Sequence, residues 1–443
     1  MDPVITAILV IISIIGIIVL TSTLKLKAFI ALFIVSVFLA FTTLPPDKIV
    51  TALKEGFGNT MASIGFLIIF GAIIAIVLDR TGATLSIANY ILSKTGNGRS
   101  AEALGITGFI TGLPIFCDSG FIILSGLGRS FSARTGLAMP FLATVLATSL
   151  YSVHCLIPPH PGALAAASVI EVNVGNLILI GILFAIPGAV SAFLFSRFMC
   201  RNRNYQPAEM PEQAADAETK DLPSAFLSFL PIIVPLLLIT VKSLISLFDK
   251  DGSSVLFKIF RFPGEPVFAL FTGVLFALLL IRKKVFESAN NYFSEAIEKA
   301  GPILIVTAAG GMFGMVIKLT GVGDSAGTLL AGTGIGLLAP FLIAAVMKTA
   351  QGSSTVAIIT TASFVAPMLN SLGLDSEWGR LLTMLSMGAG SMIVSHANDS
   401  YFWVVSNFSG INSDTTLRVY SSTTIVMGTV IFAFVWLASL FLL

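Results

Sequence analysis

The stretch YSVHCLIPPHPGA, residues 151–163, interrupts what would otherwise be a membrane-spanning helix. It stands inside a long apolar run, yet it holds His154, His160 and three prolines. A proline inside a helix removes a backbone donor and clashes with the preceding turn, so three prolines this close together preclude a continuous helix. Open backbone at membrane depth is tolerated only where it is buried in protein or lines a cavity. We therefore expect a broken helix whose interruption contributes to a binding site.

The whole chain has the composition of a membrane protein. Of its 443 residues, 56% are hydrophobic and only 11% are charged, and the mean hydropathy is +0.96. Soluble domains carry about 25% charged residues. Apolar runs of about 20 residues, the length that spans a bilayer as a helix, recur from end to end. We predict an all-α polytopic membrane protein whose partner is the lipid bilayer, and the net charge of +2 gives no reason to expect nucleic acid.

The hydropathy pattern predicts about ten transmembrane helices, two of them broken, with boundaries uncertain by a few residues. They are expected at about 3–23, 28–44, 60–79, 136–170 (broken), 176–197, 226–248, 266–282, 301–317, 380–408 (broken) and 421–443. The first lacks a basic leader and a cleavage site, so we interpret it as a retained helix and not a signal peptide. Residues 205–225 have the composition of a cytoplasmic linker.

Lysines and arginines in the short loops indicate the orientation. The basic residues that flank the spans fall on one side if the N-terminus is outside; these are Lys25, Lys27, Arg80, Lys94, Arg99, Arg129, Arg134, Arg197, Arg201, Arg203, Arg282, Lys283, Lys284 and Arg418. The loop at 249–261, with mixed charge on the outer side, is the exception. We predict a multi-pass protein of the bacterial inner membrane with both termini periplasmic.

Two apolar stretches, 104–128 and 336–372, have the pattern of re-entrant helical hairpins. Each has two short arms around a polar, glycine-containing tip, and each must begin and end on the same side for the charge rule to hold. Residues 1–204 and 226–443 then share one order of elements: three helices, a hairpin, a broken helix and a helix. Because the second half begins on the opposite side, we predict two inverted-topology repeats. Matched broken segments in two such halves indicate a transporter's binding site at the midplane.

The first hairpin tip, PIFCDSGF, places Asp118 in an otherwise apolar segment. An acid in the bilayer is costly and usually has a function or a partner. Ser119 and Gly120 are expected to begin the return arm, whose N-terminal amides suit an anion. The alternative is a cytoplasmic loop in which Asp118 caps a helix.

In HCLIPPHPG, both histidines can take up a proton near neutral pH. For His154 a functional role is favoured. For His160 an equal alternative is that it only satisfies carbonyls freed by the prolines.

The second hairpin tip, QGSSTVA, gathers small donors that can hold a carboxylate through hydroxyls and open amides. Its candidate residues are Gly352, Ser353, Ser354 and Thr355. Small-residue helix packing is the alternative.

The segment SHANDSYFW places His396, Asn398 and Asp399 together inside an apolar stretch, which again favours a break. Asn398 can bridge hydroxyl groups, and Asp399 can hold a proton or a cation. The alternative is a wetted membrane boundary, with Tyr401 and Trp403 as interfacial residues.

Two further patterns are weak. A zinc site from the two histidines with Cys117 and Cys155 matches no zinc motif, so no metal or cofactor is expected. The glycine cluster AAGGMFG, residues 308–314, lacks the Lys-Ser/Thr of a phosphate loop and indicates close helix packing.

The segments HCLIPPHPG and GSSTVA, with SHAND followed by FW, resemble the gluconate permease family, which also contains D-serine and related sugar-acid permeases. Length and element order match over essentially the whole chain. The resemblance implies an inner-membrane secondary transporter, commonly a proton symporter for gluconate or another small hydroxylated carboxylate. It also resembles the wider ion-transporter superfamily, which implies inverted repeats with hairpins and a homodimer. The chain departs from the gluconate branch at Asp118, where that branch has glutamate, and at Ser400 and Tyr401, where it has Pro-Gly.

We therefore predict a secondary transporter and not an enzyme, since a nucleophile with a base, a metal motif and an aspartyl-protease motif are all missing. A channel is disfavoured because polarity is confined to four patches. The substrate carboxylate is expected between the hairpin tips, with Asn398 and His154 on its hydroxyls. Asp118 is the first candidate for the coupling proton, before His154 and Asp399. A sodium-coupled carboxylate carrier or a D-serine-type amino acid carrier of the same fold stays open as the alternative.

Overall fold

The computed structural model describes residues 3–95, 99–201, 205–208, 222–249, 254–281, 285–321, 336–396 and 399–443. Within these ranges the chain consists of helices and their connections, with no strand. The predicted all-α class is confirmed. The asparagine at 398 and most of the predicted linker, 209–221, lie outside the described residues.

The helices include three that the sequence did not predict, at 83–95, 255–260 and 413–416. The first half contains α1 (Pro3–Ile18), η1 (Val19–Thr23), α2 (Ala28–Thr43), α3 (Pro46–Arg80), α4 (Ala83–Thr95), α5 (Ser100–Gly112), α6 (Cys117–Thr135), α7 (Met139–Leu156), α8 (Pro161–Val169) and α9 (Val174–Arg201). The second half contains α10 (Ala225–Phe248), α11 (Val255–Phe260), α12 (Pro266–Leu278), α13 (Val285–Thr320), α15 (Leu338–Gln351), α16 (Ser354–Val365), η3 (Ala366–Met368), α17 (Glu377–Gly390), α18 (Ser400–Ser409), α19 (Ser413–Thr416), η4 (Leu417–Ser421) and α20 (Ser422–Leu442).

Five helices of the described residues are long and apolar enough to cross a membrane, or six if the bent α3 counts as one span. Shorter apolar helices such as α2, α12 and α15 accompany them. The structure therefore has the helices of a polytopic membrane protein. The count of ten spans, the re-entry of the hairpins and the inverted repeats stay predictions.

Two of the helices are much longer than their predicted spans. Helix α3 begins at Pro46 rather than near 60, and α13 begins at Val285 rather than near 301. Hydropathy marks only the part of a helix that suits lipid, whereas a proline at the first helical position starts α3 earlier. The two helices pack along each other. At their crossing, a Cβ on Gly311 would lie 1.8 Å from the Thr60 hydroxyl oxygen, which confirms that the glycine cluster serves close packing.

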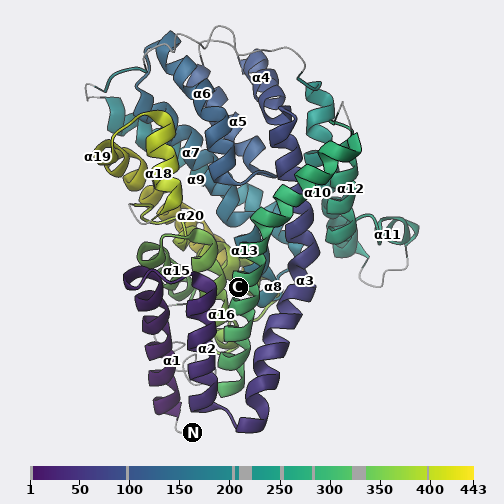
Figure 1. Cartoon of the computed structure of the whole chain (residues 1–443), viewed down its shortest axis with the longest axis vertical. Helices are drawn as coiled ribbons and strands as arrows, with labels where there is room; N and C mark the ends of the chain where they lie inside the picture. Colours follow the sequence, from purple (N-terminus) through teal and green to yellow (C-terminus); the bar gives the residue numbers. More distant parts are fainter. Residues whose placement is uncertain are drawn as a thin grey trace.

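The segment 139–169, which contains α7 and α8, forms the centre of the molecule. In its 18-residue apolar window, 94% is buried inside the molecule. The corresponding buried share is 22–56% in the other long apolar helices described. Around this segment, α5 and α6 lie in the upper half of Figure 1 and α15 and α16 in the lower half. The two helix pairs therefore approach the central segment from opposite ends.

Candidate functional site

Four helices, α6, α8, α16 and α18, begin near the centre of the molecule. Helices α8 and α16 pack together, and so do α6 and α18. At the first contact, a Cβ on Gly162 would lie 3.0 Å from the Thr355 Cα. At the second, the Phe121 and Tyr401 rings meet edge to face with their centroids 6.2 Å apart. A helix N-terminus has unpaired amides and about half a positive charge, so this arrangement favours an anion.

The start of α16 offers the donors that the sequence predicted. Gly352 ends α15 in the left-handed conformation (φ +80°), and Ser353 caps α16 by accepting from the Val356 amide. The amides of Ser354 and Thr355 have no acceptor within the helix, since they belong to its first turn. The structure thus brings all four predicted residues of this tip to one helix start.

Ser354 also connects the second hairpin to α7. Its hydroxyl interacts with the Tyr151 hydroxyl and with the Cys155 thiol. Tyr151 in turn donates to the Ser391 carbonyl at 3.3 Å. The helix start at Ser354 is therefore held against the first broken helix and the end of α17.

Lys348 is the residue that the sequence reasoning missed. It lies four residues before Gly352 on α15, and its side chain is only 1% exposed. Its ammonium donates to the Gly352 carbonyl at 2.6 Å and to Asp399 Oδ2 at 2.5 Å. The Tyr151 ring centroid lies 5.8 Å from Nζ. A lysine inside an apolar hairpin arm is as informative as an acid there, and the rule that found Asp118 would have found it.

Asp399 joins this ammonium to the second break, which lies between the end of α17 and the start of α18. The Ser395 hydroxyl donates to Oδ2, and the Tyr401 amide donates to Oδ1 at 3.0 Å, so the carboxylate caps α18. The break itself is strained, because Val394 has φ +52°. A β-branched residue in that region costs roughly 1–3 kcal/mol and persists only where the surroundings hold it. Ser421 supplies such a restraint by donating to the Ser395 carbonyl.

Asp118 lies in the first turn of α6, close enough to Lys348 and Asp399 for their charges to interact. Its Oδ1 is buried and has no hydrogen-bond partner among the described residues. Two carboxyl groups and one ammonium therefore share this region. Neither carboxyl group belongs to the same helix as the ammonium.

The first break occupies residues 157–160, between α7 and α8, at the prolines that predicted it. His160 is 2% exposed, and its Nε2 lies 2.6 Å from the Gly112 carbonyl at the end of α5. His154 Nδ1 lies 3.2 Å from His160 Nδ1. Since Nε2 must donate to the carbonyl, neutral His160 accepts through Nδ1 from His154, and His154 Nε2 is left as an acceptor. His160 thus ties the first hairpin to the break, while His154 can still contact a ligand.

The remaining predicted residues lie at the edges of this cluster. Gly120 is packed, since a Cβ there would come 2.8 Å from Leu150. His396 Nε2 lies 3.0 Å from the Thr349 carbonyl, on the outer side of α15. Ser119 belongs to the first turn of α6. The roles assigned to these residues stay predictions, and Asn398 lies outside the described residues.

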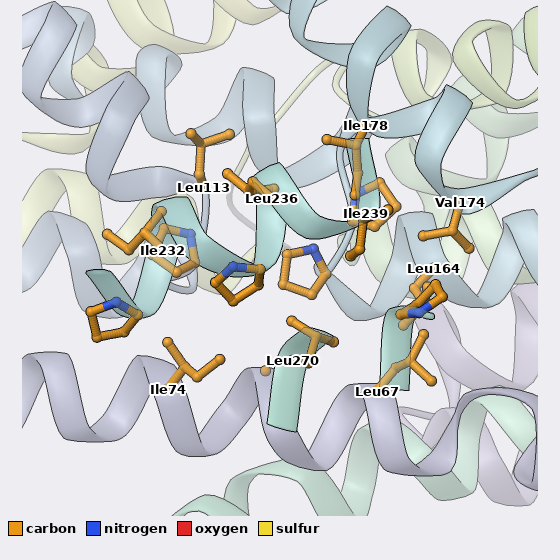
Figure 2. Close-up of a pocket in the computed structure, with 17 residues that line it drawn as sticks. Leu67, Ile74, Leu113, Leu164, Val174, Ile178, Ile232, Leu236, Ile239 and Leu270 are labelled. Atoms are coloured by element: carbon orange, nitrogen blue, oxygen red, sulfur yellow. The ribbon is translucent and has the colours of Figure 1, made fainter. Parts of the chain in front are cut away.

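An apolar pocket lies beside the first break (Figure 2). Figure 2 shows Leu67 and Ile74 of α3 and Leu270 of α12 facing Leu113, Leu164 and Ile178 across it. Its lining includes Pro158 and Pro159 of the break. No lining side chain carries a polar group, so the pocket offers nothing to a carboxylate. It marks where the break meets the helices that surround it.

A polar cavity of about 450 Å³ lies between the α3–α13 pair and the C-terminal ends of α8 and α16. Glu171, Lys318 and Arg380 line it. Helix α16 has 12 residues, so this cavity is about 18 Å from the helix start at Ser354. We therefore place the candidate site at the convergence of helix starts and not in this cavity.

Comparison with known proteins points to one family. A model described as GntP family permease matches residues 5–441. The chain is 32% identical to a gluconate permease of Pseudomonas aeruginosa over 446 residues, which cover 97% of each chain. It is 30% identical to the Gnt-II system L-idonate transporter of Escherichia coli, with 90% of each chain covered.

Two solved structures share the fold. The YdaH transporter of Alcanivorax borkumensis matches with a TM-score of 0.64 and 13% identity, over 89% of this chain and 90% of that one. MtrF of Neisseria gonorrhoeae, described within a class of antimetabolite efflux pumps, matches with a TM-score of 0.58 and 15% identity, over 87% and 83%. At these identities the two structures show the fold alone.

Proposed function

The chain belongs to the GntP permease family, and from this premise we propose that it imports gluconate or a related small hydroxylated carboxylate by proton symport. A permease is a transporter and not an enzyme, and the apolar helices make this one a multi-pass membrane protein. The relatives named for gluconate and L-idonate transport support a sugar acid as the substrate class. The inner membrane and periplasmic termini remain part of the proposal.

One observation carries the proposal: a buried ammonium and a capped helix start stand together at the second hairpin tip. A carboxylate at the start of α16 would accept from the amides of Ser354 and Thr355. The Lys348 ammonium donates to the Gly352 carbonyl of the same tip. It would neutralise the negative charge of the substrate carboxylate. Charge-assisted hydrogen bonds of this kind are roughly twice as strong as neutral ones. The tip is thereby suited to one carboxylate group.

The hydroxyl groups of a sugar acid need donors and acceptors beside the carboxylate site. His154 Nε2 supplies an acceptor, because its Nδ1 is engaged by His160. Asn398 is proposed as a second contact on the ground of its sequence position alone. A hydroxylated substrate also explains why the centre contains so many neutral polar groups, since an apolar chain would leave them unpaired.

A proton would accompany the substrate because the site already contains two carboxyl groups. Bringing a third carboxylate next to Asp118 and Asp399 is unfavourable unless one of the acids is protonated. Anion binding and proton binding therefore assist each other, and this mutual dependence is the coupling that symport requires. The charges that face one another in the structure support proton coupling without identifying the acceptor.

The structure also gives support to the amino acid alternative. Asp118 Oδ1 has no partner among the described residues, so it could accept from the ammonium of a D-serine-type substrate. The two substrate classes are separated by competition. D-Serine would displace gluconate only if the site accepted an ammonium at Asp118.

Uptake by purified protein in proteoliposomes tests the function. Radiolabelled gluconate should accumulate when an inward proton gradient is imposed, and glycerate and hexuronates should compete more strongly than D-serine. Ser354→Ala should weaken uptake, while Ser439→Ala, near the far end of α20, serves as the matched control. Absence of uptake and of competition by every acid, with protein shown to be folded, would refute the substrate class.

A further inference from the structure

We propose that Lys348 exchanges its counter-anion in each transport cycle. In the structure described above, Asp399 holds the ammonium. The substrate carboxylate would take the place of Asp399 once that side chain has gained a proton. This inference rests on the proposed function, because it assumes a carboxylate substrate, and it goes further by assigning the proton to Asp399 and the substrate's charge partner to Lys348.

The geometry leaves Lys348 no other full charge partner in its immediate contacts. Its side chain is 1% exposed and that of Asp399 is 6% exposed, so water contributes little to either group. Among the described residues the ammonium forms one ion pair, in which its Nζ lies 2.5 Å from Asp399 Oδ2. Its other oxygen contact is the carbonyl of Gly352, which carries only a partial charge. Protonation of Asp399 would therefore leave the ammonium without its contacting anion, because Asp118, the other carboxyl group whose charge reaches Lys348, forms no ion-pair contact with it in the part of the chain that the structure describes.

The groups that face Asp399 come from several elements. They are Lys348 on α15, Asp118 and Cys117 on α6, Tyr151 and Cys155 on α7, Tyr401 on α18 and Tyr420 on η4. Within this set one ammonium faces two carboxyl groups, and the tyrosines and cysteines carry no charge as neutral phenols and thiols. The pair of Lys348 and Asp399 is the only opposite-charge contact in the set. Proton gain at Asp399 is thus the change that frees a positive charge in the site.

The exchange is balanced in charge and atoms. A proton from the outer solution binds an Asp399 carboxylate oxygen, and the substrate carboxylate then forms the ion pair with the Lys348 ammonium. After reorientation, the substrate leaves to the inside, Asp399 releases its proton there, and the original pair forms again. One proton and one monocarboxylate cross together, so the transport of gluconate is electrically neutral.

The position of the ammonium also argues against a sodium ion in this place. Carriers with discontinuous helices commonly coordinate sodium by unwound carbonyls beside such helices. Here a tip carbonyl and the Asp399 carboxylate both bind the lysine nitrogen. Because Lys348 is part of the chain, its ammonium stands where a sodium ion would need these oxygen ligands. Wild-type uptake should therefore be unchanged when choline replaces sodium.

The first measurement uses the wild-type protein. Calorimetric titration with gluconate in two buffers of different ionisation enthalpy gives the number of protons taken up on binding. We expect about one proton per gluconate, because substrate and proton binding are linked. Gluconate binding without proton uptake would overturn the inference.

Variants separate the two members of the pair. Asp399→Asn should still bind and exchange gluconate, but without proton uptake and without accumulation on a proton gradient. Lys348→Met should bind gluconate at least about tenfold more weakly, since a buried charge partner is lost. Lys54→Met replaces an exposed lysine of α3 and should behave as the wild type. Asp118→Asn should keep proton uptake on binding.

A double variant guards against misfolding of the single ones. Lys348→Met combined with Asp399→Asn leaves no unpaired charge of this pair, so it should fold while binding as weakly as Lys348→Met. Binding by the double variant within about twofold of the wild type would overturn the inference. So would loss of proton uptake in Asp118→Asn with retention in Asp399→Asn. If the wild type transports no sugar acid at all, the proposed function fails; if Asp399→Asn still accumulates gluconate on a proton gradient, the inference alone fails.

Discussion

The hydrogen bonds of His160 lead to a quantitative prediction about the first break. His160→Leu would remove the donor to the buried Gly112 carbonyl and the acceptor for His154 Nδ1. Each buried polar group left unsatisfied costs about 1–3 kcal/mol, so the free energy of unfolding should fall by about 2–6 kcal/mol. His160→Gln can place its amide nitrogen near the position of Nε2 and keep the bond to Gly112. It should therefore cost only about 1–3 kcal/mol, for the contact with His154.

Thermal unfolding in detergent, followed for the wild type and both variants, measures this order. We expect His160→Leu to unfold at the lowest temperature and His160→Gln between it and the wild type, with partial gluconate uptake by His160→Gln. Equal unfolding temperatures for His160→Leu and the wild type would refute the structural role. Wild-type stability with complete loss of uptake in His160→Gln would instead support the substrate contact that the sequence suggested.

Three further predictions concern other contacts. Gly311→Ala should lower the free energy of unfolding by about 1–3 kcal/mol, because the added Cβ would overlap Thr60. Gly58→Ala is its control in the same unfolding assay. The added Cβ at position 58 meets open space, so this change should be neutral or stabilising. Ser354→Ala keeps the backbone amide but removes the hydroxyl that holds the helix start against Tyr151 and Cys155. It should raise the gluconate concentration for half-maximal uptake about threefold to tenfold, as expected for the loss of one positioning hydrogen bond, and an unchanged value would show that the hydroxyl does not position the site. Arg380→Met breaks partly exposed ion pairs with Glu171 and Asp375 and should lower the free energy of unfolding by less than about 1 kcal/mol. A much larger decrease would show that these pairs contribute more than surface ion pairs usually do.

The breaks and the hairpin tips could be predicted because they depend on local chemistry. Prolines at 158, 159 and 161 interrupt a helix whatever surrounds them, and helix α8 begins at Pro161. Gly352 ends α15 in a conformation that glycine adopts without strain. The seryl cap at Ser353 follows from the same local rules. Such signals need no knowledge of tertiary contacts.

The pairing of side chains could not be predicted in this way. Lys348 and Asp399 are 51 residues apart, and only the fold brings them within 2.5 Å. Hydropathy also gave no account of where α3 and α13 begin, because the helices continue through charged residues beyond the apolar part. The role of His160 depended on the end of α5, a distant carbonyl that no local pattern reveals.

The most direct test of the account is the uptake of labelled gluconate into sodium-free proteoliposomes under an imposed proton gradient. We predict accumulation above the outside concentration that disappears when a protonophore dissipates the gradient. The account would be contradicted if gluconate accumulated only after a sodium gradient was added to the same assay. It would also be contradicted if the folded protein accumulated no sugar acid under a proton gradient or a sodium gradient.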